Sequence, residues 1–213
     1  ARYWHGKGAA VGELLSQLNL AYMEDPRSEE RAVLCRGYFP SVVKAAEAGD
    51  IVAADELGDM YLYGFGVEKS GKQAVFWLEK GAEKGYWRSL NALGDMYRLG
   101  EEVEEDGKKA LSLYRKAEEM HSREALTSIG FMYYAGQGVD FDEGKAFSYF
   151  RKAAGAGDLD ALFMMGRCYM EGSAVEKDDR KAADCFKETA DRGYPMGMWA
   201  LGQSYLHGIG VQR

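Results

Sequence analysis

One stretch of the sequence decides the fold: residues 125–157 read ALTSIGFMYYAGQGVDFDEGKAFSYFRKAAGAG. The spacing of its glycine, tyrosine and valine residues returns along the chain every 36 residues. This self-similarity predicts a solenoid of stacked repeats, because so short a unit buries its apolar face only against its neighbours. Four columns keep the period: Gly58, Gly94, Gly130, Gly166 and Gly202; Tyr61, Tyr97, Tyr133, Tyr169 and Tyr205; Gly64, Gly100, Gly136, Gly172 and Gly208; and Val67, Val103, Val139, Val175 and Val211.

Each repeat is predicted to contain two helices. In the repeat that begins near residue 51, Ala54, Leu57 and Tyr61 follow the i, i+3, i+7 spacing of one helix face. Gly64 should end this first helix, because glycine readily adopts the left-handed conformation found after the last helical turn. A second helix is expected from about residue 71 to about residue 84, with its own apolar face. The two faces must pack against each other.

The turn between the two helices contains a second, less regular glycine column. It holds glycine in three repeats but Glu102 and Ala174 in the other two. We therefore expect the first glycine of the turn to need a positive φ in every repeat. The second position need not have a positive φ.

The glycine column of Gly58 falls inside the first helix, where glycine costs about 0.5 to 1 kcal/mol relative to alanine. A cost that recurs in each repeat needs a steric reason. We expect the two helices of a pair to approach so closely at this glycine that any Cβ atom would push them apart.

The period also sets the expected organisation, which is one continuous solenoid domain. Its final unit contains a first helix and a turn but no second helix, so we expect a longer protein or a partner that covers this end. The expected units are a degenerate N-terminal repeat or cap at 1–50, four repeats at 51–86, 87–122, 123–158 and 159–194, and an incomplete fifth repeat at 195–213.

Composition excludes several classes of function. The formal net charge of −7 argues against nucleic acid as the main partner, because affinity for a polyanion depends on neutralising phosphates. The chain contains no apolar run near the roughly 18 residues that suggest a membrane span, so no membrane insertion is expected. Cys35, Cys168 and Cys185 lack a repeated spacing, which favours free thiols and a cytoplasmic or other reducing compartment.

The repeated pattern A-x-x-L-G-x-x-Y-x-x-G-x-G-V, followed by Lys-Ala, an aromatic pair and Lys-Ala-Ala-x-x-Gly, resembles the Sel-one-like repeat, a relative of the tetratricopeptide repeat. The resemblance covers about residues 44–213. It implies an all-α, right-handed superhelix of antiparallel helix pairs that acts as a protein-binding adaptor or scaffold. A secreted bacterial branch of this family carries a cysteine pair eight residues apart in each repeat, and this chain lacks those cysteines.

By analogy with the tetratricopeptide superhelix, the first helix of each pair should line a concave groove that binds another protein or peptide. The groove positions lie beside the recurring Leu-Gly-Tyr stripe and differ from repeat to repeat, as a recognition surface requires. Self-association through the C-terminal end is a further expectation. The predicted partner-binding residues are Asp59, Tyr63, Asn91, Asp95, Arg98, Phe131, Tyr134, Phe163, Arg167, Met170, Trp199 and Gln203.

No catalytic, cofactor or metal site is predicted. Ser41 and Lys44 have the Ser-x-x-Lys spacing of penicillin-recognising enzymes, but the companion motifs are missing and Lys44 belongs to a repeat column. The three histidines are scattered without metal-ligand spacing. Two alternatives remain beside the adaptor: a noncatalytic regulatory segment of a larger enzyme or signalling protein, and a small-molecule hydrolase that uses Ser41.

Overall fold

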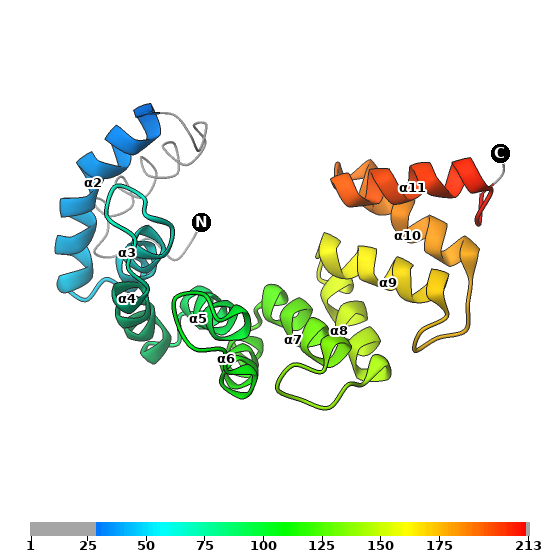
Figure 1. The fold of residues 1–213 in the computed structure, drawn as a ribbon, viewed down its shortest axis with the longest axis horizontal. Helices are drawn as coiled ribbons and strands as arrows, with labels where there is room; N and C mark the ends of the chain where they lie inside the picture. Colours follow the sequence, from blue (N-terminus) through cyan, green and yellow to red (C-terminus); the bar gives the residue numbers. More distant parts are fainter. Residues whose placement is uncertain (1–28, 212–213) are drawn as a thin grey trace. The chain divides into compact units, whose positions relative to one another are not determined.

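The structure, a computed structural model, describes residues 29–211 (Figure 1). All regular secondary structure in this range is helical, which confirms the expected all-α fold of paired helices. The helices are α2 (Glu29–Glu47), α3 (Ile51–Tyr63), α4 (Gly71–Glu83), α5 (Trp87–Leu99), α6 (Gly107–Glu119), α7 (Arg123–Ala135), α8 (Glu143–Gly155), α9 (Leu159–Glu171), α10 (Asp179–Asp191) and α11 (Pro195–His207).

The second helix of each complete repeat begins at a capping side chain. Ser70, Asp106, Asp142 and Asp178 occupy this position, and each accepts a hydrogen bond from the backbone N–H three residues later. Such a cap satisfies one of the N–H groups that have no partner within the helix. The polar residue that recurs every 36 positions therefore fixes where the second helix starts.

The turn between the two helices differs from expectation at its second position. Gly64 has a φ of 75° and ends α3, as predicted. The second position is also left-handed in every repeat, with φ values of 62° at both Glu102 and Ala174. The expectation that this position tolerates other conformations is wrong, because the turn keeps one backbone shape whichever residue occupies it.

The helix-interior glycines confirm the predicted close approach. A Cβ atom added at Gly58 would lie 2.6 Å from Cγ of Leu78 on α4. At Gly130 it would lie 2.6 Å from Cε1 of Phe150 on α8. Both distances are shorter than two non-bonded carbon atoms allow. A large side chain of the second helix therefore occupies the space that glycine leaves empty.

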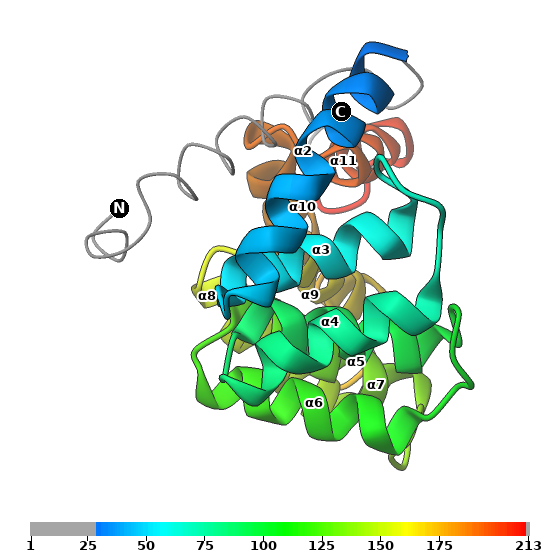
Figure 2. The same ribbon diagram turned by 90° about the vertical axis from the view of Figure 1, so that its left-hand side faces the viewer.

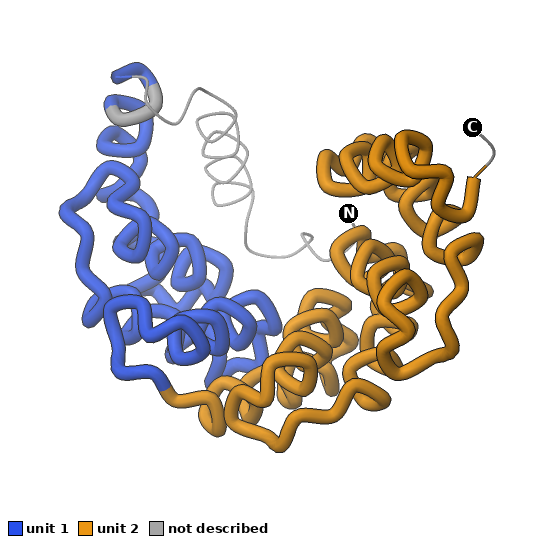
Figure 3. The backbone as a smooth tube through the Cα atoms, turned by 45° about the vertical axis from the view of Figure 1, so that its right-hand side comes forward, with its two compact units in different colours: residues 1–105 blue, residues 106–213 orange. Residues whose placement is uncertain are grey.

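The chain divides into two compact units, residues 1–105 and residues 106–213 (Figure 3). In the first unit, α2 packs against α3 (Figure 2). Cys35, Val42 and Ala46 of α2 join a core with residues of α3 and α4, so α2 buries apolar side chains against the first repeat. Residues 1–28 of the expected cap lie outside the described residues. In the second unit, α6 to α11 pack pairwise in chain order.

Candidate partner-binding surface

The first helices present a regular contrast on either side of their interior glycine. The residue before the glycine is buried in the first three repeats: Leu57, Leu93 and Ile129 are at most 2% exposed. The residue after the glycine is partly exposed in all five repeats, and its identity changes each time. These residues are Asp59, Asp95, Phe131, Arg167 and Gln203.

Two aromatic residues of α7 form the centre of this surface in the second unit. The rings of Phe131 and Tyr134 are both partly exposed, and both rest on Phe150, which is fully buried. Phe131 meets Phe150 edge-on with 5.2 Å between ring centroids, and Tyr134 lies 6.5 Å from it. Because one side of each ring packs on Phe150, their conformations are restricted before any partner binds.

Residues of α9 continue the surface. Arg167 donates a hydrogen bond of 3.5 Å to the hydroxyl of Tyr134 and forms a 2.7 Å ion pair with Glu171. Met170 lies partly exposed three residues after Arg167. The structure thus brings four of the predicted residues, Phe131, Tyr134, Arg167 and Met170, onto two neighbouring first helices.

Phe163 is not part of the accessible surface. It is 9% exposed and packs against Phe186, 5.5 Å away between centroids, and against Tyr194, 5.9 Å away. The expectation that it lies open is wrong, because this position, three residues before the glycine, turns toward the following helices. Trp199 occupies the same position in α11 and is 62% exposed.

Asn91, at the same position of α5, is 9% exposed, so its predicted placement on an open groove wall is wrong as well. Asp55 shows what this position does in the first repeat. It accepts a 2.7 Å hydrogen bond from the Ser89 hydroxyl and pairs with Arg88 at 3.4 Å, so it joins α3 to α5.

The remaining predicted residues of the first unit give this part of the surface an acidic character. Burial, aided by the charges of Asp55 and Glu56, raises the pKa of Asp59 to about 7. Tyr63 is 58% exposed, and burial of its hydroxyl together with the charge of Asp59 raises its pKa. In both groups burial is the larger cause, and neighbouring carboxylates add to it.

Asp95 and Arg98 lie on the next first helix, α5. Both side chains are partly exposed, and they form an ion pair of 3.2 Å. The first-unit surface therefore contains at least one cation among its carboxylates.

The family of the chain follows from its repeats. The Sel1 repeat family matches residues 51–86, 87–122, 123–158, 159–194 and 195–213. The chain belongs to the Sel1 repeat family. Among curated proteins, no sequence matches it.

Solved structures of Sel1 repeat proteins resemble this chain. A protective antigen present in uropathogenic Escherichia coli strains, which displays an SLR fold, is 31% identical over 95% of this chain and 43% of its own, with a TM-score of 0.74. A Sel1 repeat protein from Oxalobacter formigenes is 29% identical over 93% of this chain and 79% of its own, with a TM-score of 0.77. This chain thus spans less than half of the E. coli chain.

An immunity protein from Pseudomonas aeruginosa is 21% identical over 87% of this chain and 68% of its own, with a TM-score of 0.60. At this level of identity the likeness concerns the fold alone.

Sequence reasoning missed one set of contacts of this Sel1 repeat protein. The ammonium groups of Lys145 and Lys181 lie over the rings of Tyr133 and Tyr169, at 5.2 and 5.4 Å from the centroids. The sequence contains both columns, the tyrosine and the lysine of the Lys-Ala pair. Their separation of 12 residues was the signal that could have predicted these cation–π contacts.

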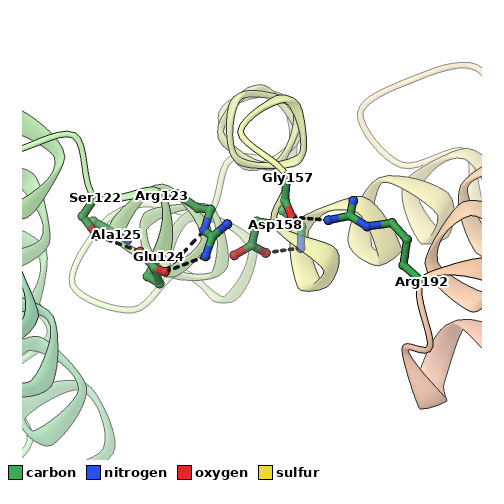
Figure 4. A network of polar contacts seen from close by, with 8 residues as sticks. Ser122, Arg123, Glu124, Ala125, Gly157, Asp158 and Arg192 are labelled. Atoms are coloured by element: carbon green, nitrogen blue, oxygen red, sulfur yellow. Dashed lines mark hydrogen bonds and ion pairs between the residues drawn. The ribbon is translucent and has the colours of Figure 1, made fainter. Parts of the chain in front are cut away.

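The turns that join consecutive repeats are tied by polar contacts (Figure 4). Asp158 caps α9 by accepting from the N–H of Ala161 at 2.9 Å. Arg192, at the end of the following repeat, donates a 2.9 Å hydrogen bond to the carbonyl oxygen of Gly157. This bond fixes the spacing of two neighbouring repeats.

The remaining residues singled out in the sequence are a serine–lysine pair and the cysteines. Ser41 and Lys44 are exposed on α2. The three cysteines form no disulfide bond, and burial raises the pKa of the Cys185 thiol to about 11. Within residues 29–211, no helix has the length and apolar character needed to cross a membrane.

Proposed function

We propose that this Sel1 repeat protein is a noncatalytic adaptor whose first helices bind a segment of a partner protein. Sel1 repeat proteins are generally protein-interaction modules. The observation that carries the proposal is the contrast around the interior glycine: the apolar residue before it is buried in the first three repeats, and the residue after it is partly exposed and changes in all five. A constant scaffold that holds variable accessible side chains is what selective binding needs.

In the second unit, the partner segment would meet Phe131, Tyr134, Arg167 and Met170. Aromatic residues and arginine contribute most strongly to protein interfaces. Phe150 holds both rings in place, so little conformational entropy is lost when a partner packs on them. This patch suits a segment with apolar side chains.

In the first unit, the chemistry is different. Asp59 and Tyr63 on α3 and Asp95 on α5 offer carboxylates and a phenol. This surface suits a segment that carries lysine or arginine, because opposite charges orient a partner and exclude wrong ones.

The test begins with affinity purification and mass spectrometry to identify a partner, followed by calorimetric titration of that purified partner. The double variant Arg167→Glu with Met170→Asp should weaken binding by at least about tenfold, since both side chains are accessible. Phe131 and Tyr134 are left unchanged, because they also pack on the core residue Phe150.

A matched double variant, Arg151→Glu with Met120→Asp, makes the same two chemical changes at exposed positions away from the first helices. It should leave the affinity within about twofold. Equal losses in the two double variants, or no loss in either, would exclude the first-helix surface as the binding site.

A further inference from the structure

Asp59 and Asp95 occupy the same position in the first two repeats, directly after the interior glycine, but they have different neighbours. Arg98 lies three residues after Asp95, and the two side chains form an ion pair of 3.2 Å. Leu62, which is 5% exposed, lies three residues after Asp59. The second repeat therefore supplies its own arginine to this carboxylate, whereas the first repeat has an apolar residue at that place.

Arg88, at the start of α5, is the cation that acts on Asp59, and it already has a closer partner. It forms a 3.4 Å ion pair with Asp55, which is 2% exposed and also accepts a hydrogen bond from Ser89. Glu56, which is 8% exposed, adds a third carboxylate near Arg88. Negative charge is therefore in excess beside Asp59.

Two tyrosines also face Asp59 among the described residues. Tyr63 lies one turn later on α3, and Tyr86 directly precedes α5. Burial raises the pKa of Tyr86 to about 12 and also raises that of Tyr63, so both hydroxyls are neutral at neutral pH. The helices that pack on α3 add apolar groups: α4 meets Gly58 with Leu78, and α2 shares a hydrophobic core with α3.

Asp59 itself is partly exposed, so a side chain of another protein can approach its carboxyl group. Burial, followed by the charges of Asp55 and Glu56, raises its pKa to about 7. The protonated form is therefore well populated near neutral pH. A cation placed beside the carboxyl group would favour its charged form and lower the pKa.

We propose that a lysine or arginine side chain of the bound partner pairs with Asp59 and displaces its proton, which couples partner binding at the first-unit surface to pH. The proton passes to the solvent, and the new ion pair takes the place that Arg98 fills beside Asp95. This inference rests on the proposed adaptor function. Affinity should rise by up to about tenfold per pH unit below about pH 7 and level off above it, because binding no longer has to remove a proton.

The test follows the side-chain carboxyl group of Asp59 by nuclear magnetic resonance through a pH titration, with N-acetylarginine methylamide as the probe. N-acetylcitrulline methylamide is the matched control compound, because it has nearly the same shape and no charge. With about 100 mM of either compound at constant ionic strength, the arginine compound should lower the titration midpoint by about half a pH unit or more. The citrulline compound should leave the midpoint unchanged.

The partner purified in the adaptor test supplies a second measurement. Its dissociation constant, measured by calorimetric titration, should be at least about tenfold lower at about pH 8 than at about pH 5.5. Asp59→Asn should weaken binding at the higher pH and abolish this change, whereas any contribution from histidines of either protein would persist in the variant. Asp184→Asn, the same substitution at an exposed position of α10, should keep the pH profile of the parent.

Two results would overturn the inference. The two compounds could have equal effects on Asp59, or Asp59→Asn could leave the pH profile of partner binding intact. Neither result would remove the adaptor function, because the double variant Arg167→Glu with Met170→Asp tests that function independently. Failure of the adaptor function would in turn leave the response of Asp59 to the arginine compound unchanged.

Discussion

The hydroxyl of Ser89 donates a 2.7 Å hydrogen bond to the carboxylate of Asp55, and both side chains are buried, at 0% and 2% exposed. The bond joins the first helices of two consecutive repeats, 34 residues apart. A carboxylate so deeply buried needs polar partners, since leaving one unsatisfied is costly.

Replacement of this hydroxyl tests how much the bond contributes. Ser89→Ala should lower the free energy of unfolding by about 1 to 3 kcal/mol, because the buried Asp55 carboxylate loses this hydrogen bond and keeps its ion pair with Arg88. Urea denaturation followed by circular dichroism measures the change. Ser128→Ala, on the first helix α7, is the control, and an equal loss there would show that the bond has no special role.

Asp59 predicts a dependence of stability on pH. Its pKa is about 7 in the folded protein against 3.8 for an ordinary aspartate, so the folded state binds more protons between these values. The stability contributed by its protonated form is complete below pH 3.8 and is lost as the pH rises toward about 7. Asp59→Asn should remove this loss and raise the free energy of unfolding at pH 8 by about 1 kcal/mol or more.

The measurement is a series of urea denaturation curves between pH 5 and pH 8. Asp184→Asn, at an exposed position of α10, serves as the control and should leave the pH profile of the parent intact. If Asp59→Asn and the parent lose stability in parallel over this range, the pKa of Asp59 is not raised.

Gly130 tests the close contact within a helix pair. Gly130→Leu should lower the free energy of unfolding by about 1 to 3 kcal/mol, because Phe150 already fills the space beside the glycine. Gly202→Leu is the control at the same repeat position, where an added Cβ meets nothing within 4 Å. Thermal melts of dilute protein should separate the two variants, and identical melting temperatures would remove the packing explanation.

Ala174 tests the strain in the turn. Its φ of 62° is unfavourable for any residue with a Cβ atom, so Ala174→Gly should stabilise the folded protein by about 0.5 to 1 kcal/mol. The reverse change at the same position of another repeat, Gly138→Ala, should destabilise it, because the added carbon would overlap Gly107. The midpoints of urea denaturation report both changes, and a destabilised Ala174→Gly would contradict the strain.

The helix pairs could be predicted from the sequence because their determinants are local. Gly64 ends a helix, and Gly58 marks a close contact with the second helix of the same repeat. The left-handed second turn position was missed because Glu102 and Ala174 hide a backbone requirement that other repeats reveal through glycine.

The candidate surface was harder to predict because it depends on the neighbouring repeats. Phe163 and Phe131 look alike in the sequence as aromatic residues near the interior glycine. Only the position of Tyr194 and Phe186 shows that Phe163 is buried, whereas Phe131 keeps one side accessible. Helix period alone cannot distinguish a face that meets solvent from one that meets the next helix.

The bond from Arg192 to Gly157 spans 35 residues, and the main helix contacts of the second unit join helices adjacent in the chain. Such short-range contacts allow folding to begin at any helix pair and spread to its neighbours. Disruption spreads in the same stepwise manner. In residues 106–211, a destabilising substitution in one helix pair should lower the stability of the adjoining pairs first. The more distant pairs should stay folded longest.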